Sequence, residues 1–401
     1  DYEEYFPIDF SLMKQVASEQ VVIRTSVWGL NQLLRLRRRL KFQPIQSELQ
    51  KWSPNAQSKL SWWQKVKDGI TETLNIPDEQ IGWLLPALWT GMGLIRKLGV
   101  DAVYSTASPW TAHLIGYWLR RFTGIPWIAD FRDPWTQNPW KIKRSKLREK
   151  LEASMEKSVV SYADIVIANT PTLREDFVQR YGFLNPDKFV TITNGFDPNE
   201  CVQLSQSRRD DSTVFTITHT GSLYAQRDPR PLFVAIEQLL MENCIPADRL
   251  RINLVGKSEG LVSEFLANHP LVEKVVRIIP QVTHQKCLEY LMNSDVLLLI
   301  QPETTLQIPG KIFEYIQVQK PILALTHPEG ATAQLILSDG IGVVVEPEDV
   351  VGIKKQVLSL YQMFRCGNLR ADYPIDVCQK YSMQQLTKQL ANLLEQLVSE
   401  K

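Results

Sequence analysis

The chain has 401 residues, of which 44% are hydrophobic and 22% charged, and its net charge at pH 7 is +1. This length suits two globular domains, and the near-neutral charge gives no reason to expect nucleic acid as a partner. No apolar run is long enough to span a bilayer, and the start, Asp1–Tyr5, has neither the basic nor the apolar region of a signal peptide.

The cysteines and histidines argue against a disulfide framework and against a metal site. The five cysteines are scattered and form no Cys-x-x-Cys pair, and the five histidines do not have the spacing of metal ligands. We therefore expect a cytoplasmic protein with no bound metal. The first residue is not methionine, so we also expect the chain to begin inside a longer protein.

The first half of the chain alternates short apolar runs with segments of helical spacing. Strands are predicted at Val21–Thr25, Ala102–Tyr104, Trp127–Phe131, Ile165–Ala168 and Phe189–Ile192. Helices are predicted at Pro109–Arg121, Lys146–Val160 and Thr172–Tyr181. Residues 31–75 have no clear period and are interpreted as a helical or irregular insertion. His113, inside one predicted helix, is expected to be packed or on the surface and not catalytic.

The second half alternates more regularly. Strands are predicted at Val214–Thr218, Ile252–Val255, Val275–Ile279, Val296–Ile300, Ile322–Leu325 and Gly342–Val345, with helices such as Leu232–Leu240 and Gln285–Met292 between them. Alternating strands and helices predict parallel sheets in an α/β fold. The turn residues Asn194–Pro198 predict a boundary between domain 1–198 and domain 199–375, and a C-terminal helix over 376–401 is expected to return to the first domain.

Two segments of the second half have residues suited to a phosphate. Thr220-Gly221-Ser222-Leu223 follows a predicted strand, with Arg227 close behind, and backbone N–H groups after a glycine can hold an anion. Gly310 and Lys311 open a predicted helix, and Glu314 lies one turn further on, where it could accept from ribose hydroxyls. A plain turn and a capped helix with a surface lysine are the alternative interpretations.

The first half has one comparable cluster. Asp130, Arg132 and Asp133 follow the strand led by Trp127, and two carboxylates around a guanidinium can orient a sugar. A structural ion pair is the alternative. Two basic runs, Arg35–Lys41 and Lys141–Lys150, are either solvated surfaces or contacts to an anionic membrane.

Several motifs together resemble glycosyltransferase family 4, in particular its bacterial branch. They are Ala102–Pro109, Trp127–Trp135, Asn194–Asp197, Thr220–Leu223, Leu254–Lys257, Gly310–Tyr315 and Lys320-Pro321, in family order over roughly residues 100–350. The resemblance implies a GT-B fold, in which two doubly wound, Rossmann-like parallel-sheet domains face a cleft. It also implies transfer of a sugar, with retention and without a metal, from a nucleotide diphosphate sugar to a sugar or lipid-linked acceptor of the cell envelope or an exopolysaccharide.

The resemblance gives the candidate residues their roles. Gly221, Ser222, Arg227, Gly310 and Lys311 would hold the diphosphate, Gly256 and Lys257 the nucleotide, and Glu314 the ribose. Asp130, Arg132 and Asp133 would serve catalysis, with the enzyme on the inner face of the membrane. No cofactor is expected beyond the donor.

Three departures from the family pattern keep alternatives open. Leu306 stands where the Glu-x7-Glu motif has its first glutamate, with Glu303 or Gln307 as substitutes, and Arg132-Asp133 replaces a frequent His-Asp. No strand with a Gly-rich loop precedes Val21, so the first domain is expected to lack its leading strand–loop–helix unit. A sugar-nucleotide epimerase and a non-catalytic nucleotide-sugar-binding protein therefore remain alternatives.

Overall fold

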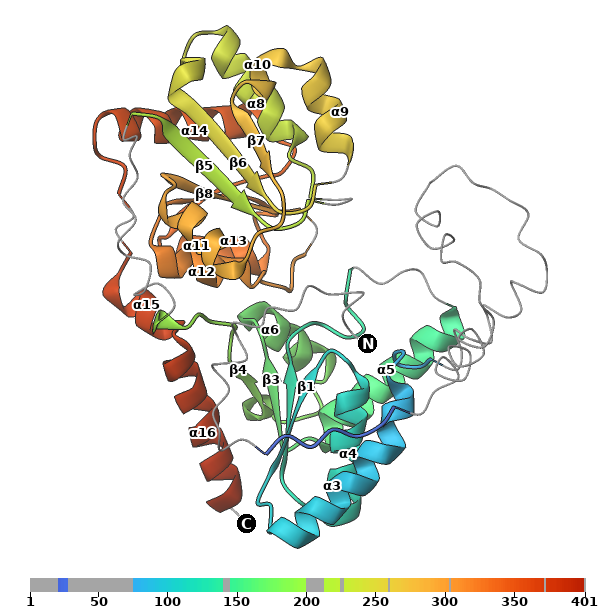
Figure 1. Cartoon of the computed structure of the whole chain (residues 1–401). Coiled ribbons are helices and arrows are strands. Elements are labelled where there is room, and N and C mark those ends of the chain that lie inside the picture. Colours follow the sequence, from blue (N-terminus) through green and yellow to red (C-terminus); the bar gives the residue numbers. More distant parts are fainter. Residues whose placement is uncertain are drawn as a thin grey trace, which may run out of the picture. The chain divides into compact units, whose positions relative to one another are not determined.

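A computed structural model describes residues 21–27, 75–139, 145–199, 213–223, 227–258, 260–302, 304–370 and 373–399 (Figure 1). The chain divides into two compact units. The described residues of the first unit lie within Val21–Ala168, Phe177–Val190 and Leu394–Lys401, and those of the second within Asn169–Asp176 and Thr191–Leu393. The basic run Arg35–Lys41, Glu303 and nearly all of the predicted insertion 31–75 lie outside the described residues.

The first unit contains a four-stranded sheet with helices packed on it. Its strands are β1 (Val103–Ala107), β2 (Trp127–Phe131), β3 (Ile165–Ala168) and β4 (Phe189–Thr191), in the spatial order β1-β2-β3-β4. Its helices are η3 (Ile81–Trp83), α3 (Leu84–Leu98), α4 (Thr111–Thr123), α5 (Lys146–Tyr162), α6 (Pro171–Arg180), which continues into the second unit, and η4 (Pro186–Lys188). All five residues of β2 are buried, because β2 is paired on both sides and covered by helices.

Two expectations for the first half are wrong, and a third holds for only some of its described residues. Val21–Thr25 is not a strand: residues 21–27 have no regular structure, and the Thr25 hydroxyl accepts a hydrogen bond from Trp83 Nε1 at 2.6 Å. Asp130 does not follow β2 but lies inside it. The run Lys141–Lys150 is not wholly solvated, because Arg148 is buried and its Nε lies 2.8 Å from Glu152 Oε1.

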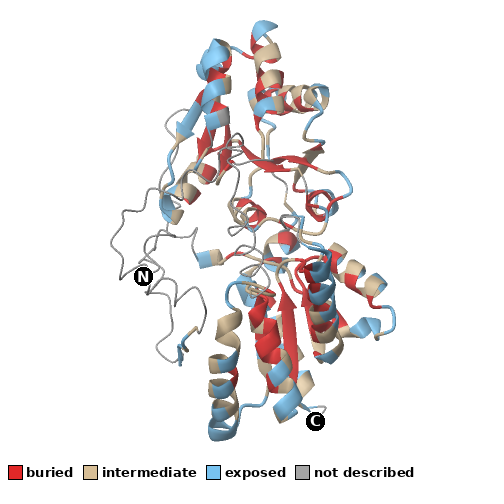
Figure 2. Ribbon diagram, turned by 90° about the vertical axis from the view of Figure 1, so that its right-hand side faces the viewer, coloured by how far each residue is buried: buried red, intermediate tan, exposed pale blue. Residues whose placement is uncertain are grey.

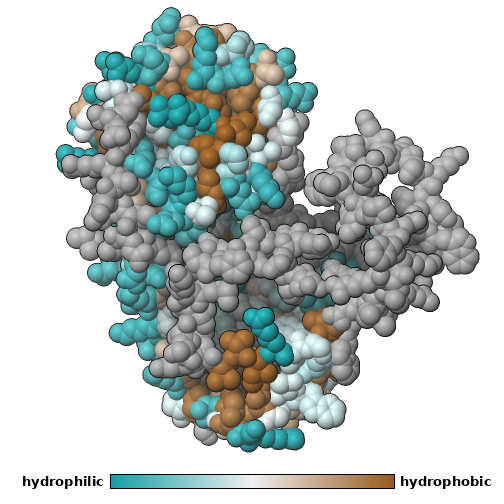
Figure 3. Space-filling model, in the orientation of Figure 1, coloured by the Kyte–Doolittle hydropathy of each residue, from teal (hydrophilic) through white to brown (hydrophobic). Residues whose placement is uncertain are grey.

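Apolar side chains gather at the lower end of the face shown in Figure 3, where residues 21–27 pass beside α3 in Figure 1. Exposed apolar residues of these two segments include Val21, Val22 and Leu98. β1 is one edge of the described sheet. The predicted loss of a leading strand–loop–helix unit concerns mainly residues outside the described ranges and stays a prediction.

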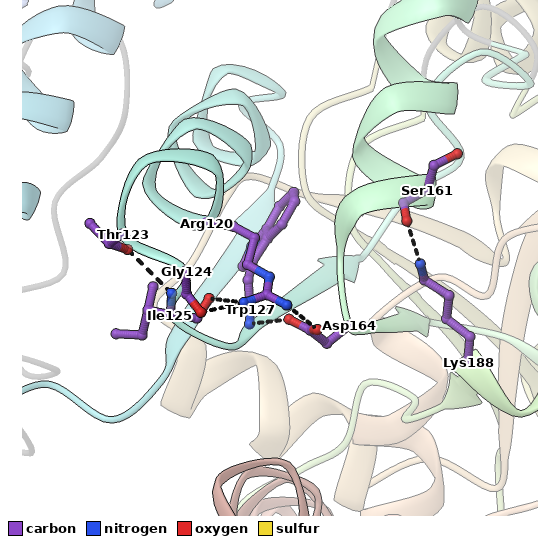
Figure 4. Close-up of polar contacts among 8 residues, drawn as sticks. All are labelled: Arg120, Thr123, Gly124, Ile125, Trp127, Ser161, Asp164 and Lys188. Carbon is purple, nitrogen blue, oxygen red and sulfur yellow. Dashed lines mark hydrogen bonds and ion pairs between the residues drawn. The ribbon is translucent and has the colours of Figure 1, made fainter. Parts of the chain in front are cut away.

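One polar cluster joins the carboxyl ends of α4 and α5 (Figure 4). Arg120 donates to the carbonyls of Gly124 and Ile125 and to Asp164 Oδ1, and Asp164 Oδ2 accepts from the backbone N–H of Trp127 at 2.9 Å. Lys188 Nζ donates to the Ser161 carbonyl at 2.7 Å. Cations at helix carboxyl ends offset the negative end of the helix dipole, so this cluster fixes how β2 and β3 begin.

The second unit contains a six-stranded sheet in the order β10-β9-β8-β5-β6-β7, and every strand pair given a register is parallel. Its strands are β5 (Phe215–Thr220), β6 (Leu250–Val255), β7 (Val276–Ile279), β8 (Val296–Gln301), β9 (Ile322–Thr326) and β10 (Gly342–Val345). Its helices are α8 (Arg230–Met241), η5 (Ala247–Arg249), α9 (Gly260–Asn268), α10 (Pro270–Glu273), α11 (His284–Met292), α12 (Lys311–Val318), α13 (Ala331–Ser338), α14 (Val350–Arg365), α15 (Ile375–Lys380) and α16 (Met383–Ser399). The last residues of α16, from Leu394 on, group with the first unit.

The second sheet has an apolar core on each face. Phe215 and Ile217 of β5 pack with α8 and α14, whereas Leu297 and Leu299 of β8 pack with α11, α12 and α13. Figure 2 shows the strands as the buried layer. This doubly wound arrangement leaves the carboxyl ends of the central strands as the place for a ligand.

No helix among the described residues is both long enough and apolar enough to cross a membrane.

Candidate functional site

The order of strands in the second unit reverses beside β5. The chain proceeds from β5 through β6 to β7 on one side, and β8, β9 and β10 lie on the other. β5 and β8 have only two residue pairs in register, Ile217↔Val296 and Thr218↔Leu297. Beyond them the two strands stop pairing, which makes this the topological switch point where open α/β sheets bind ligands.

Side chains replace the missing backbone pairing at this point. The Leu298 carbonyl accepts hydrogen bonds from His219 Nδ1 at 3.0 Å and from the Tyr315 hydroxyl at 3.0 Å. The oxygen of the same hydroxyl accepts a hydrogen bond from the backbone N–H of Thr220 at 3.3 Å. Burial lowers the pKa of His219 to about 3, so the imidazole is neutral, and its Nδ1 carries the hydrogen that is donated to the Leu298 carbonyl.

Two glycines after β5 and β6 pack directly on one another. Gly221 and Gly256 have φ angles of +114° and +136°, a region that favours glycine. A methyl group on Gly256 would lie 2.5 Å from the Gly221 carbonyl oxygen. Leu223 then donates its backbone N–H to the Lys257 carbonyl at 2.8 Å. The structure therefore brings Gly221 and Ser222 beside Gly256 and Lys257, although the Lys257 side chain is exposed.

Lys311, the first residue of α12, reaches the same place. Its ammonium group lies against Gly221, where it fills the space that any larger side chain at position 221 would take. Burial, and next to it the positive charge of Arg227, lower the pKa of Lys311 to about 8, while Glu314 opposes the shift. The structure thus brings four candidate residues close together: Gly221, Arg227, Lys311 and Glu314. Gly310 is the N-cap of α12.

Sequence reasoning missed three residues of this region. Tyr315 and His219 close the β5–β8 gap, and Cys287 of α11 lies near Thr220, Lys311 and Glu314, with a pKa raised to about 11 chiefly by burial. The polar triplet Thr218-His219-Thr220 was the available signal. Polar residues that continue a buried strand mark a place where the strand's own backbone pairing ends.

This arrangement can hold a diphosphate. Two cations, Arg227 and Lys311, lie close to one another, and Lys311 begins α12, where the positive end of the helix dipole also favours an anion. Such an arrangement is suited to neutralising the charge of a leaving phosphate with groups that are fixed before the reaction. The loop before α12 is itself fixed, because Leu306 accepts from the Thr170 hydroxyl at 2.7 Å and Thr305 from the N–H of Ala331 at 2.8 Å.

The candidate residues of the first unit form a separate cluster. Asp130 is fully buried; its Oδ2 accepts from Arg132 Nε at 2.8 Å and from the Tyr104 hydroxyl. Burial raises the pKa of Asp130, and the positive charge of Arg132 opposes the rise. Asp133 is half-buried in the loop after β2. The structure therefore joins Asp130 to Arg132 and leaves Asp133 as the more accessible carboxylate.

The loop that carries Asp133 is held rigidly. Trp135 stacks on Trp110 with 5.1 Å between ring centroids, and the backbone N–H of Thr136 donates to Glu156 Oε2 at 2.8 Å. Glu156 is fully buried and also accepts from the Tyr181 hydroxyl at 2.6 Å. A functional side chain on such a loop would be held in a single position even before a substrate binds.

One family profile and one curated protein each match part of this chain. The profile of Glycosyltransferase Family 4 matches residues 64–200. A curated relative, the alpha-maltose-1-phosphate synthase of Mycolicibacterium smegmatis, is 27% identical over 88 residues, which is 22% of this chain and 23% of that protein. The aligned region thus spans about a quarter of that relative's length.

Solved structures agree over most of the chain. Sucrose-phosphate synthase from Thermosynechococcus elongatus has a TM-score of 0.61 at 15% identity, covering 80% of this chain and 79% of its own. HepE from Anabaena in complex with UDP has a TM-score of 0.58 at 17% identity, covering 82% and 89%. At these identities the likeness defines the fold: the chain has the GT-B fold, and its residues 64–200 match the profile of Glycosyltransferase Family 4.

Proposed function

We propose that this chain is a retaining hexosyltransferase that uses a nucleotide diphosphate sugar, with a UDP-sugar as the first donor to test. The observation that carries the proposal is the contact of the Lys311 ammonium with Gly221 at the topological switch point. A cation at that position, with Arg227 nearby, is suited to the leaving diphosphate. Solved structures of HepE, which has the same fold, contain UDP and UDP-glucose.

The roles of the residues follow from their places. Lys311 and Arg227 would neutralise the diphosphate, and the backbone of Gly221 and Ser222 would contact it, because no side chain at Gly221 blocks the approach. Gly256 and Lys257 would contact the nucleotide, and Glu314 the ribose. We propose that these groups make a metal ion unnecessary, since they supply the charge stabilisation that Mg²⁺ provides in other transferases.

The acceptor is proposed to be a sugar, free or lipid-linked, used to build a cell-envelope or extracellular polysaccharide. Asp130, Arg132 and Asp133 would act in catalysis on the acceptor side, with Asp133 in contact with substrate and Asp130 holding Arg132 in place. A cytoplasmic enzyme working at the inner face of the membrane suits a lipid-linked acceptor. Co-sedimentation with anionic vesicles that responds to salt would support this location, and no response to lipid charge would contradict it.

The test begins with binding. UDP should raise the thermal midpoint of the full chain, by a shift that grows with its concentration. UDP-glucose and other UDP-sugars are then incubated with and without candidate acceptors in the presence of EDTA, and the release of UDP and the anomeric configuration of the product are followed by NMR. Turnover that needs an acceptor and survives EDTA supports a transferase. Conversion of the donor without an acceptor identifies an epimerase, and binding without turnover a binding protein.

A further inference from the structure

A cavity of about 320 Å³ lies within the second unit, and neither the diphosphate site nor the first-unit cluster contributes candidate residues to it. It is lined mainly by one side of α13 and by the start of α16. Residues Gln334, Leu335 and Ser338 come from α13, and Leu386 and Gln389 from α16. A cavity of this size is within the range of natural small-molecule sites.

The wall of the cavity is fixed by backbone hydrogen bonds. Phe196 donates its N–H to the Tyr381 carbonyl at 3.1 Å, and Met383 donates to the Phe196 carbonyl at 2.9 Å. The Tyr381 hydroxyl donates to Asp339 at 2.5 Å, and its ring packs on Phe313 with 5.3 Å between centroids. Tyr381 lines the cavity, so the cavity is preformed.

The chemistry of the lining selects the class of ligand. The floor is apolar, with Ile308, Leu335 and Leu386, and the polar groups around it are uncharged amides and hydroxyls such as Gln334, Gln389 and Thr193. A hydrocarbon chain would contact only the floor, whereas a hydroxylated ligand would also use the amides at the edge of the cavity, of which Gln334 is exposed and Gln389 half-buried. The lining also includes one cation, Lys380, whose Nζ is paired with Asp339 at 3.0 Å, so the site offers no excess charge to an anion.

We propose that this cavity binds a neutral saccharide of one or two rings. A sugar ring has an apolar C–H face that matches the floor and hydroxyls around its edge that match the amides. The site lies apart from the residues proposed to bind the nucleotide, so it neither requires nor excludes the proposed transfer reaction.

The test is calorimetric titration of the full chain with D-glucose and with maltose, in the presence of saturating UDP so that the proposed donor site is filled. If UDP does not bind, the proposed function fails, and the same titrations without UDP still test the cavity. Saturable binding in the millimolar range is expected, which is about 4 kcal/mol. Absence of saturable binding of both sugars would overturn the proposal.

Three variants assign the binding to the cavity. The double variant Gln334→Ala/Gln389→Ala should weaken binding at least about tenfold, because it removes polar partners of the ligand. Ser338→Trp, at an exposed position, should fill the mouth and abolish binding. Lys388→Ala, on an exposed part of α16 that does not line the cavity, should bind like the wild type. Thermal midpoints check that each variant is folded.

Two results would overturn the assignment. Equal affinity in all three variants would place the saccharide elsewhere on the chain. Binding of glucose 1-phosphate more than about tenfold tighter than glucose would show that the site selects an anion, and the proposed ligand class would be wrong.

Discussion

The ammonium group of Lys311 occupies the space directly over Gly221, so that the two residues exclude any side chain at position 221. The glycine is also needed for its φ of +114°. One small residue therefore serves two purposes: it lets the chain turn out of β5, and it admits the cation that begins α12. The two motifs therefore lie together although they are 90 positions apart in sequence (311 minus 221).

Gly221→Ala should displace Lys311 and strain the turn. We expect it to lower the free energy of unfolding by about 1–3 kcal/mol and to weaken UDP binding. Calorimetry with UDP and denaturant unfolding measure the two effects. Gly260→Ala is the control, since its added methyl group would meet open space at the start of α9. If Gly221→Ala bound UDP as tightly as the wild type, Lys311 would not be a ligand of the nucleotide.

Lys311→Ala should remove a charge that acts on the leaving diphosphate. We expect a loss of about 2–4 kcal/mol in transition-state stabilisation, measured as kcat/KM with a UDP-sugar donor. Lys388→Ala, at an exposed position of α16, serves as a charge-matched control. A variant with wild-type kcat/KM would rule out Lys311 as the diphosphate ligand.

Nucleotide affinity should depend on the charge of Lys311. Because burial and Arg227 lower its pKa to about 8, the free protein loses this charge as pH rises through about 8. A bound diphosphate favours the charged form, so affinity for UDP should be level below that pH and fall above it, by up to about tenfold per pH unit. Lys311→Arg keeps its charge and should flatten the profile. A wild-type profile that stays level between pH 7 and 10 would contradict the assignment.

Apolar runs were sufficient to place the interior strands, because a strand buried on both faces must be apolar along its length. Trp127–Phe131 and Ile165–Ala168 have the predicted bounds, and so does the half-buried edge strand Gly342–Val345. The predicted end of β5 is wrong by two residues. Polar His219 and Thr220 continue the strand because Leu298 and Tyr315, far away in sequence, receive their hydrogen bonds.

The same limit explains the other errors. Val21–Thr25 has the composition of a strand, but a strand also needs a partner, and its exposed apolar side chains do not pair with the described sheet. Arg148 belongs to a basic run, yet it is buried because Glu152 and the carbonyls of Asn75 and Pro77 accept its N–H groups. Composition gives a residue's tendency, whereas a partner distant in sequence decides its environment.

The two aspartates of the first unit should behave differently when changed to asparagine. Asp130→Asn removes the charge that faces Arg132 in a buried strand, and we expect it to lower the free energy of unfolding by about 1–3 kcal/mol. Asp133→Asn should lower kcat about tenfold or more, because it alters a group proposed to orient substrate. Asp101→Asn, at an exposed position before β1, is the control. If Asp133→Asn had the kcat of the wild type, Asp133 would have a structural role in its loop and no role in the reaction.

Gly195 is predicted to be essential for the stability of the second unit. A methyl group there would lie 2.5 Å from Leu386 Cδ1 and would overlap the Tyr381 carbonyl, whose hydrogen bond from Phe196 joins residues 194–197 to the start of α16. Gly195→Ala should push these segments apart and lower the free energy of unfolding by about 1–3 kcal/mol. It should also weaken saccharide binding in the α13–α16 cavity, since Tyr381 and Leu386 form part of its wall.

The measurement is urea unfolding of Gly195→Ala beside Gly260→Ala, whose added methyl group meets no neighbour. The comparison separates the clash from the general effect of replacing glycine by alanine, which reduces the entropy of the unfolded chain and is stabilising where the conformation allows it. Because backbone cannot give way as a flexible side chain can, the Tyr381 carbonyl should make the difference between the two variants large. Equal unfolding midpoints would show that residues 194–197 and 381–383 separate without cost, and that their pairing does not support the fold.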